Sequence, residues 1–327
     1  MEKDKNLEIQ VSSTTLGYEG QGGTINSGLA LAEGIVSKEA YTYLVKENAK
    51  AFKEETEKEI PEAKFGVSAL ASVINPKMMG DMVRSLDYPY AIDWGLDFVK
   101  EKKKKIEREG NEGKDAIIAL GAELGYALLQ ARLGRGQVAS TVKVAKKVNR
   151  ETASDPVRIR TCIETVQFED EIQKIRKITR KLLDKDISSI WVLEPNKKTG
   201  DRTLSEFLER YDRVIDSHPE LRFAIDLDMG NLPEENNLLS VLDRMDRNRK
   251  LPLFISLSGQ DSINGDVRTH LPLYESSIGY GSKLGEWMHT MQQRGNSLPG
   301  LVIETSPAQE NVKQDYSNFL KEFKKGL

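Results

Sequence analysis

The sequence predicts an α/β protein folded as a single (β/α)8 TIM barrel. Short apolar segments recur through its second half, and each is bounded by Pro, Gly or Asp. Apolar runs of this length predict strands that are buried on both faces. The stretches between them are long enough for helices, and strands that alternate with helices form a parallel sheet. The clearest segments are SIWVLEP (189–195), RFAIDLD (222–228), LFISLSG (253–259) and LVIET (301–305).

The first half adds four more strand candidates, which brings the count to the eight that a barrel requires. These candidates are residues 7–13, 64–72, 126–132 and 157–164. Segment 126–132 could instead continue the helical run DAIIALGAELG that precedes it. Helical patterns follow the strands at 37–59, 91–110, 137–150, 169–185, 203–217, 233–247, 282–294 and 308–325, and Ser37 is a plausible N-cap for the first. We expect one domain over 1–327, with loop insertions near 14–36 and 258–281.

Composition limits the partners and the compartment. The net charge is -3, so no global basic field draws the protein to nucleic acid or to membranes, although a local basic groove is compatible with it. The single cysteine, Cys162, excludes an intrachain disulfide, and its apolar surroundings predict a packed thiol. Without an apolar signal segment or a membrane-length apolar run, the sequence predicts a cytoplasmic protein that binds no membrane.

Acidic residues stand at the ends of three predicted strands. They are Glu194, Asp228 and Glu304. In TIM barrels, ligands bind at the carboxyl ends of the strands, so these carboxylates are expected to meet at one mouth. Alternatively, each could cap its own strand end or bind the N–H groups of the following helix. Because buried carboxylates without partners are costly, a shared site is favoured for the ordered set.

The second half also resembles the xylose isomerase-like TIM-barrel superfamily, and in particular its endonuclease IV branch. The resemblance implies that Glu194, Asp228 and Glu304 are metal ligands and that His270 is a loop ligand. Ser256 and Asn231 stand where the family has histidines, and Arg268 stands where the endonuclease branch has an acidic ligand. Four stretches in the family's order carry this resemblance: LEPNKKTGDR (193–202), IDLDMGN (225–231), FISLSGQDSINGDVRTHLPLYESSIGYG (254–281) and LVIETSP (301–307).

The scarcity of histidine argues against a site that binds several metals. Besides His270, the chain has only His218, predicted at the end of an outer helix, and His289, predicted within a helix. Carboxylates, with Gln260, Asp261 or His270 in reserve, suit one hard divalent cation, so Mg²⁺ or Mn²⁺ is expected rather than Zn²⁺.

Such an ion could chelate adjacent oxygens of a sugar and stabilise an enediolate. The leading hypothesis is therefore a metal-dependent isomerase or epimerase that acts on a sugar or polyol. The resemblance to the xylose isomerase-like superfamily implies that Glu194 and Glu304 are its catalytic carboxylates. The residues expected to contact its substrate are Asn196, Asn231, Ser256, Gln260 and Arg268. One alternative is an endonuclease IV-like phosphodiesterase acting on abasic DNA. Another is a non-catalytic barrel that binds a partner or serves as a scaffold.

Overall fold

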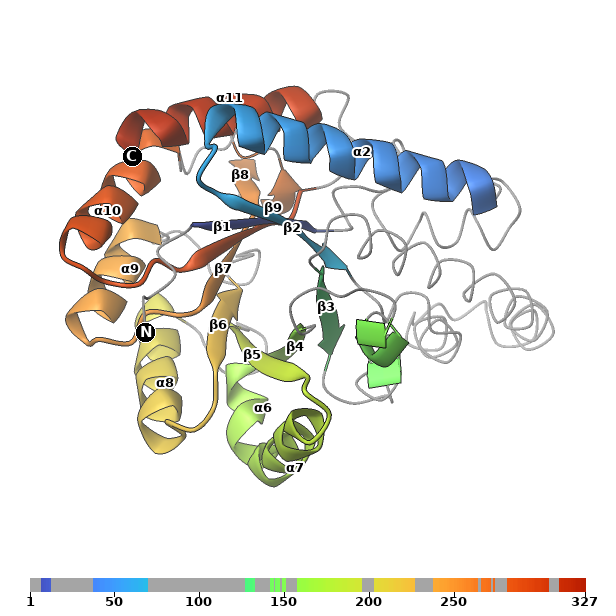
Figure 1. Cartoon of the computed structure of the whole chain (residues 1–327). Helices are drawn as coiled ribbons and strands as arrows, with labels where there is room; N and C mark the ends of the chain where they lie inside the picture. Colours follow the sequence, from blue (N-terminus) through green and yellow to red (C-terminus); the bar gives the residue numbers. More distant parts are fainter. Residues whose placement is uncertain are drawn as a thin grey trace, which may run out of the picture.

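Eight parallel strands close into a barrel in the order β1-β10-β7-β6-β5-β4-β3-β2, which confirms the predicted TIM-barrel fold (Figure 1). The computed structural model describes residues 7–12, 38–69, 127–132, 142–143, 145–147, 149–150, 158–195, 203–226, 238–263, 266–271, 273, 281–305 and 312–327. The barrel strands are β1 (Glu8–Ser12), β2 (Lys64–Ala69), β3 (Ala127–Arg132), β4 (Arg158–Glu164), β5 (Ser188–Glu194), β6 (Phe223–Asp226), β7 (Phe254–Leu257) and β10 (Gly300–Ile303). Each of the eight predicted strand segments overlaps one of them, and β5 and β10 begin one residue before the predicted segment.

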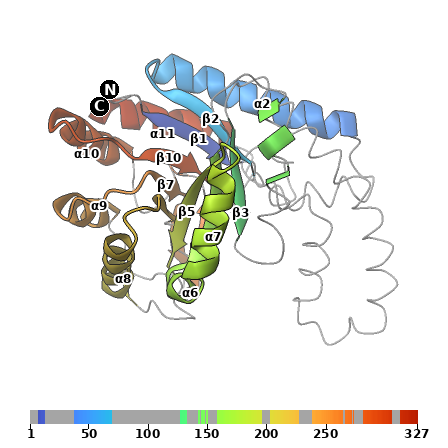
Figure 2. The same ribbon diagram turned by 60° about the horizontal axis from the view of Figure 1, so that its bottom comes forward.

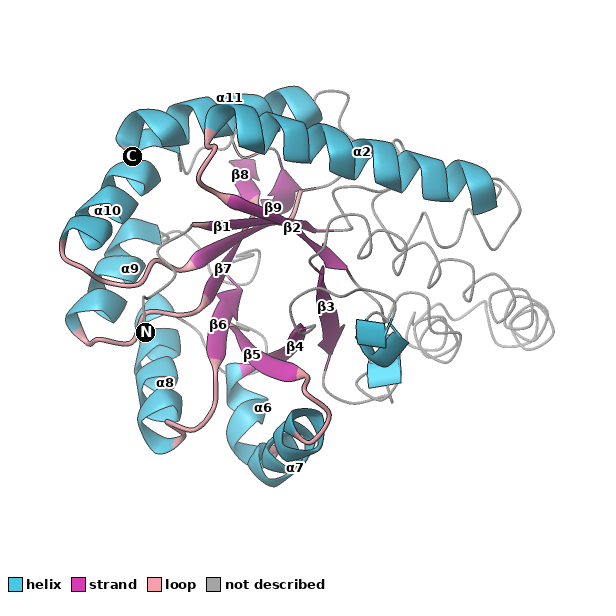
Figure 3. Cartoon of the chain, viewed as in Figure 1, coloured by secondary structure: helices cyan, strands magenta, loops and turns pink. Residues whose placement is uncertain are grey.

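Helices surround the barrel (Figures 2 and 3). They are α2 (Lys38–Glu59), α6 (Thr165–Asp170), α7 (Ile172–Leu183), α8 (Leu204–Ser217), α9 (Leu238–Arg247), α10 (Gly281–Gln293) and α11 (Val312–Gly326). The helix predicted at 169–185 is in fact two helices, which meet at Glu171. The helix predicted at 91–110 and the N-cap Ser37 lie outside the described residues. Within the described ranges, no helix combines the length and the apolar character that crossing a membrane requires.

The two faces of each strand differ in character. Side chains alternate along a strand, so the outward residues pack beneath the helices while the others point into the barrel. The outward set is apolar and includes Ile159, Trp191 and Ile255. The inward set contains both apolar and polar residues. Its apolar residues form a small cluster of Cys162, Ile190, Val192, Ala224, Phe254 and Val302. The buried polar residues of the inward set are Gln10, Ser12, Ser68, Arg160, Asp226, Ser256, Ser258 and Glu304.

The amino-terminal end of the barrel is occupied by an ion pair. The Arg158 guanidinium donates to the Glu8 carboxylate, with Nη1 at 3.1 Å, and lies 5.1 Å from the centre of the Phe254 ring. Burial raises the pKa of Glu8, although Arg158 opposes this shift. The opposite, carboxyl-terminal end is where barrels bind their ligands.

A hairpin follows β7, where the sequence predicts a long loop. Its strands are β8 (Gly259–Ile263) and β9 (Asp266–Leu271), which pair antiparallel and form a sheet separate from the barrel. The hairpin lies between β7 and α10 in the chain. It therefore emerges from the carboxyl end of a barrel strand.

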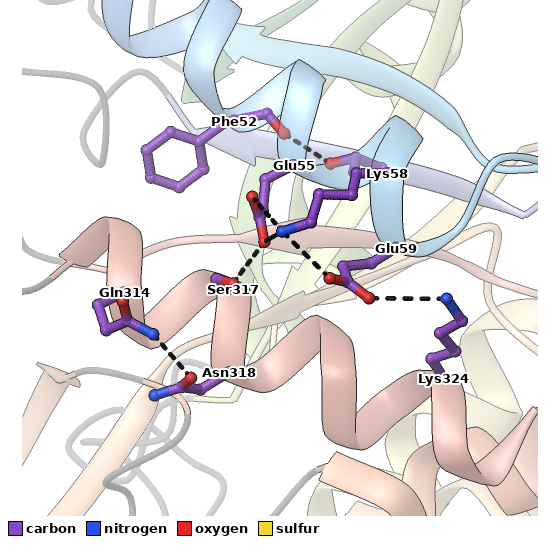
Figure 4. Close-up of polar contacts among 9 residues, drawn as sticks. Phe52, Glu55, Lys58, Glu59, Gln314, Ser317, Asn318 and Lys324 are labelled. Atoms are coloured by element: carbon purple, nitrogen blue, oxygen red, sulfur yellow. Dashed lines mark hydrogen bonds and ion pairs between the residues drawn. The ribbon is translucent and has the colours of Figure 1, made fainter.

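The first and last described helices are joined by polar contacts. The hydroxyls of Thr56 and Tyr316 are 2.7 Å apart and buried. Ser317 donates to the Glu55 carboxylate, and Lys324 lies 3.6 Å from Glu59 (Figure 4). These contacts align α2 with α11 and close the helical layer next to β1 and β2.

Candidate functional site

Three metal-ligating side chains converge at the carboxyl end of the barrel. Cys162 Sγ and one carboxylate oxygen each from Glu194 and Asp226 lie within 4.8 Å of one another. These residues come from β4, β5 and β6, which are neighbours in the barrel. Cys162 and Asp226 are buried, whereas Glu194 is partly exposed. The cluster therefore has a buried floor and one carboxylate nearer to solvent.

Strand alternation explains why these side chains meet. Cys162 shares the inward face of β4 with Arg160, and Asp226 shares the inward face of β6 with Ala224. Asp226 pairs in register with Ser256 on β7, and Glu194 is the last residue of β5. The parallel order of the strands thus brings distant parts of the chain to one end of the barrel.

A buried arginine lies one inward position below the cysteine. Arg160 is fully buried and donates from Nη1 to Ser256 Oγ at 2.6 Å and from Nη2 to the Glu304 carboxylate. Its Nε has no hydrogen-bond partner within the described part of the chain. These bonds link β4 to β7 and to the residue that follows β10 across the barrel interior.

The surrounding anions keep this arginine charged. Burial by itself lowers the pKa of the Arg160 guanidinium, because a buried cation loses its hydration. Glu304, Cys162 and Asp226 together outweigh burial, so the pKa lies above its ordinary value. Arg160 therefore interacts electrostatically with the Cys162–Glu194–Asp226 cluster as well as with its ion-pair partner.

Two carboxylates that the sequence predicts as ligands of one ion have different partners in the structure. Glu194 belongs to the cluster with Cys162, whereas Glu304 accepts a hydrogen bond from Arg160. Asp228 lies outside the described residues, because the described part of β6 ends at Asp226. Asp226 lies two residues earlier and is the acidic residue of β6 that joins the cluster.

The structure describes the remaining candidate residues to different extents. Ser256 is buried and bound to Arg160. Gln260 lies on β8, and Arg268 and His270 lie on β9, with their side chains outside what is described. Asn196 and Asn231 lie wholly outside the described residues.

The two other histidines are on helices, as predicted. His218 is the C-cap of α8 and lies 3.3 Å from Arg176 Nη2. Burial, reinforced by Arg176, lowers the pKa of its imidazole. His289 is within α10, where its ring lies 2.7 Å from the Gln293 amide nitrogen. Neither belongs to the cluster at the barrel mouth.

Sequence reasoning missed Cys162, Asp226 and Arg160 as site residues. The signal was present as alternation: in VRIRTCIE, Arg160 and Cys162 fall on the same strand face, and in RFAIDLD, Asp226 and Asp228 do so. What the sequence could not indicate is which neighbouring strand supplies the next ligand. That depends on the register of β4 against β5 and of β5 against β6.

The three donors could supply part of the shell of one divalent ion. Ligand atoms at about 2.0–2.3 Å from a common ion are about 3.3–3.8 Å apart in a tetrahedral shell, so donors within 4.8 Å of one another would have to move closer together, and further ligands would have to complete the shell. Two carboxylates suit Mg²⁺ or Mn²⁺, whereas a thiolate favours a softer ion such as Zn²⁺. This mixed set therefore differs from the all-oxygen site that the strand-end carboxylates alone predict.

Comparisons with known proteins identify no family for this chain. No model of a protein family matches the sequence, and no curated protein matches it. Among solved structures, the chain is similar to the ligand-free form of a tryptophan synthase from M. tuberculosis, with 10% identity and a TM-score of 0.42. That similarity covers 99% of this chain and 93% of the other. None of these comparisons shows membership of the xylose isomerase-like superfamily, and the fold assignment rests on the strand order itself.

Proposed function

We propose that the protein is a divalent-metal-dependent enzyme that isomerises or epimerises a sugar or polyol at the carboxyl end of its barrel. The observation that carries this proposal is the convergence of Cys162, Glu194 and Asp226. Their location is the end at which TIM barrels place their chemistry. The resemblance of the second half to the xylose isomerase-like superfamily supports the same class of substrate.

Cys162, Glu194 and Asp226 would hold the ion. When bound, the ion would act as a Lewis acid on the oxygens of the substrate. The sulfur of Cys162 moves the proposed ion away from Mg²⁺ and toward Zn²⁺, with Mn²⁺ between them. Glu194 is the most exposed of the three, so we assign it the contact with substrate and the movement of a proton at a substrate carbon.

Glu304 has a different role in this proposal. Its carboxylate accepts a hydrogen bond from Arg160, which also donates to Ser256. The Glu304 side chain is nearly buried and is engaged by a fully buried guanidinium, so its carboxylate is committed to that contact. We therefore assign Glu304 to positioning Arg160 beneath the cluster, and not to proton transfer or to the ion.

Ion titration of the metal-free protein tests the proposal. Isothermal titration calorimetry with Zn²⁺, Mn²⁺ and Mg²⁺ should show one site, and Asp226→Asn or Glu194→Gln should weaken binding by more than about tenfold. Glu164→Gln is the matched control, because Glu164 pairs in register with Glu194 but is outside the cluster. Failure of all three ions to bind, or equal losses in all three variants, would overturn the ion site. A panel of aldoses and ketoses then tests the reaction.

A binding protein without catalysis is the second candidate. The observation that favours it is the Arg160–Glu304–Ser256 group, which places a fixed, hydrogen-bonded network across the barrel interior. A protein of this kind would bind a sugar or polyol without turning it over. Tight binding of an aldose by the ion-loaded protein, with no change in the sugar over hours, would favour this candidate.

A further inference from the structure

Helix α7 presents a basic face to the outside of the barrel. Its sequence, IQKIRKITRKLL, contains five cationic residues and no acidic residue. The helix packs on β5 through its buried residues Ile175 and Leu182, and the Trp191 indole N–H donates to Thr179 Oγ1 at 3.0 Å. These contacts fix the rotation of α7, so the opposite side of the helix is directed away from the barrel (Figure 2).

The outer face of α7 lines a groove of about 420 Å³. Counted from its first lining residue, the others follow at positions i+3, i+4, i+7 and i+8, so all of them lie on one side of the helix. Arg176 lies 3.1 Å from Glu220, whereas Lys177, Arg180 and Lys181 make no ion pair in the part of the chain that the structure describes. The groove is lined by Gln173, Arg176, Lys177, Arg180 and Lys181. The lining is thus four cations and one amide.

The basic face is short and ends in acidic residues. From Gln173 to Lys181 a helix advances about 12 Å. The residues before this stretch are Glu169, Asp170 and Glu171, and those after it include Asp184 and Asp186. An extended polyanion running along the helix would therefore meet carboxylates at both ends, whereas a compact one would fit between them.

The chemistry of the groove favours a small ligand. Its described lining comes from one helix and is mostly exposed, so a ligand would be held by charge rather than by enclosure. The described lining holds no aromatic side chain, so it offers no stacking platform for the bases of a single-stranded nucleic acid. Guanidinium groups bind phosphate oxygens in pairs, and lysines contribute point charges.

We propose that the α7 groove binds a compact anion that carries two or more phosphate groups. Arg176 and Arg180 would each bind a phosphate through paired N–H donors, and Lys177 and Lys181 would neutralise the remaining charge. The site is on the outer wall of the barrel and uses none of the residues of the Cys162–Glu194–Asp226 cluster. It is therefore independent of the proposed reaction.

Calorimetric titration of the full chain with tripolyphosphate tests this proposal. The protein is first freed of divalent ions, because tripolyphosphate chelates them. Saturable binding to one site is expected at low salt, and it should weaken at about 0.15 M salt, where exposed charges are screened. The variant Arg180→Gln/Lys181→Gln should bind at least about tenfold more weakly, since it loses two charged contacts.

The matched control is Lys50→Gln/Lys53→Gln on α2. It removes the same charge from exposed residues that pair with Glu54 and Glu57 on their own helix, and it should bind tripolyphosphate like the parent. Equal losses in both variants would show non-specific attraction and overturn the proposal, as would a lack of binding by the parent. A single-stranded oligonucleotide of about 20 nucleotides, binding more tightly than tripolyphosphate through Arg180 and Lys181, would overturn the compact ligand in favour of a nucleic acid.

Discussion

Arg160 and Glu304 form a buried ion pair although 144 residues separate them in the chain. The side chain of Arg160 is 0% exposed and that of Glu304 is 8% exposed. Taking two charges out of water is costly, and mutual attraction compensates only while both partners are present. The pair therefore links β4 to the residue after β10 across the barrel interior through a matched set of charges.

Replacing Glu304 with Gln should lower the free energy of unfolding by about 3 kcal/mol, because the buried guanidinium loses its closest anion. Urea unfolding followed by circular dichroism measures the loss. The double variant Arg160→Met/Glu304→Gln should lose less than the sum of the two single variants, since it leaves no uncompensated charge. Additive losses would show that the two residues do not stabilise each other. Glu194→Gln, at a partly exposed position, is the control and should cost less.

The barrel was predictable from the sequence because its strands are short apolar runs with polar boundaries. Segment 126–132 was ambiguous, since an apolar run next to a helical pattern can be a strand or the continuation of the helix. Its parallel pairing with β2 and β4 shows that residues 127–132 form a strand. The hairpin was also predictable in principle. Asn264 and Gly265, between two alternating segments, are a strong hairpin signal, but the surrounding polar residues obscured it.

The candidate site was predictable only in part. The rule that acidic residues at strand ends lie at the barrel mouth selected Glu194, which belongs to the cluster, and Asp228, which lies outside the described residues; Asp226, on the same strand face, was not selected. Positions two residues apart share a face, and only the register with the neighbouring strands selects between them. The partner of Glu304 could not be predicted, because no local pattern links it to Arg160.

Cys162 should determine which ion the cluster prefers. Replacing it with Ser exchanges a thiolate for a hydroxyl, and thiolates favour Zn²⁺ much more than Mg²⁺. We expect the variant to lose at least about tenfold in Zn²⁺ affinity while its Mg²⁺ affinity changes little. Competition titrations with a chromogenic chelator measure both affinities. An equal change for the two ions would exclude the sulfur as a ligand.

Thr203 should stabilise α8 through its capping box. Its hydroxyl accepts from the Glu206 N–H at 3.2 Å, and its own N–H donates to the Glu206 carboxylate at 3.3 Å. Thr203→Ala removes the first of these bonds and should lower the free energy of unfolding by about 1 kcal/mol. Thr203→Ser keeps the hydroxyl and should stay close to the parent. If both variants lost the same amount, the methyl group and not the cap would be responsible.

Gly285 should tolerate no side chain, because α10 and α11 touch at this position. A Cβ atom added there would lie 2.2 Å from the Phe323 carbonyl oxygen and 3.0 Å from Gly326 Cα, and both are backbone atoms that cannot rotate away. Gly285→Ala should therefore lower the free energy of unfolding by about 2 kcal/mol or more. Gly281→Ala is the control, since its Cβ would meet only the side chain of Glu322, at 3.0 Å. Thermal unfolding of the two variants should separate them clearly.

The contact between Ser317 and Glu55 should make the α2–α11 interface sensitive to acid (Figure 4). The hydrogen bond from Ser317 is the chief cause of the lowered pKa of Glu55, and burial opposes it weakly. A carboxyl whose pKa is lower in the folded state contributes stability above its unfolded value of 4.5, and this contribution is lost as the pH falls through the folded value.

Ser317→Ala should therefore lower the free energy of unfolding by about 0.5–1 kcal/mol at pH 7, a modest loss because the Glu55 side chain is still partly exposed. The difference from the parent should shrink as the pH falls below 4.5, where Glu55 becomes protonated in both proteins. Urea unfolding at several pH values measures it. In a Glu55→Gln background the group no longer titrates, so the effect of Ser317→Ala should be the same at every pH. If Ser317→Ala lowered the stability of the parent by the same amount at acidic pH as at pH 7, the loss would come from packing around Ser317, which is itself buried.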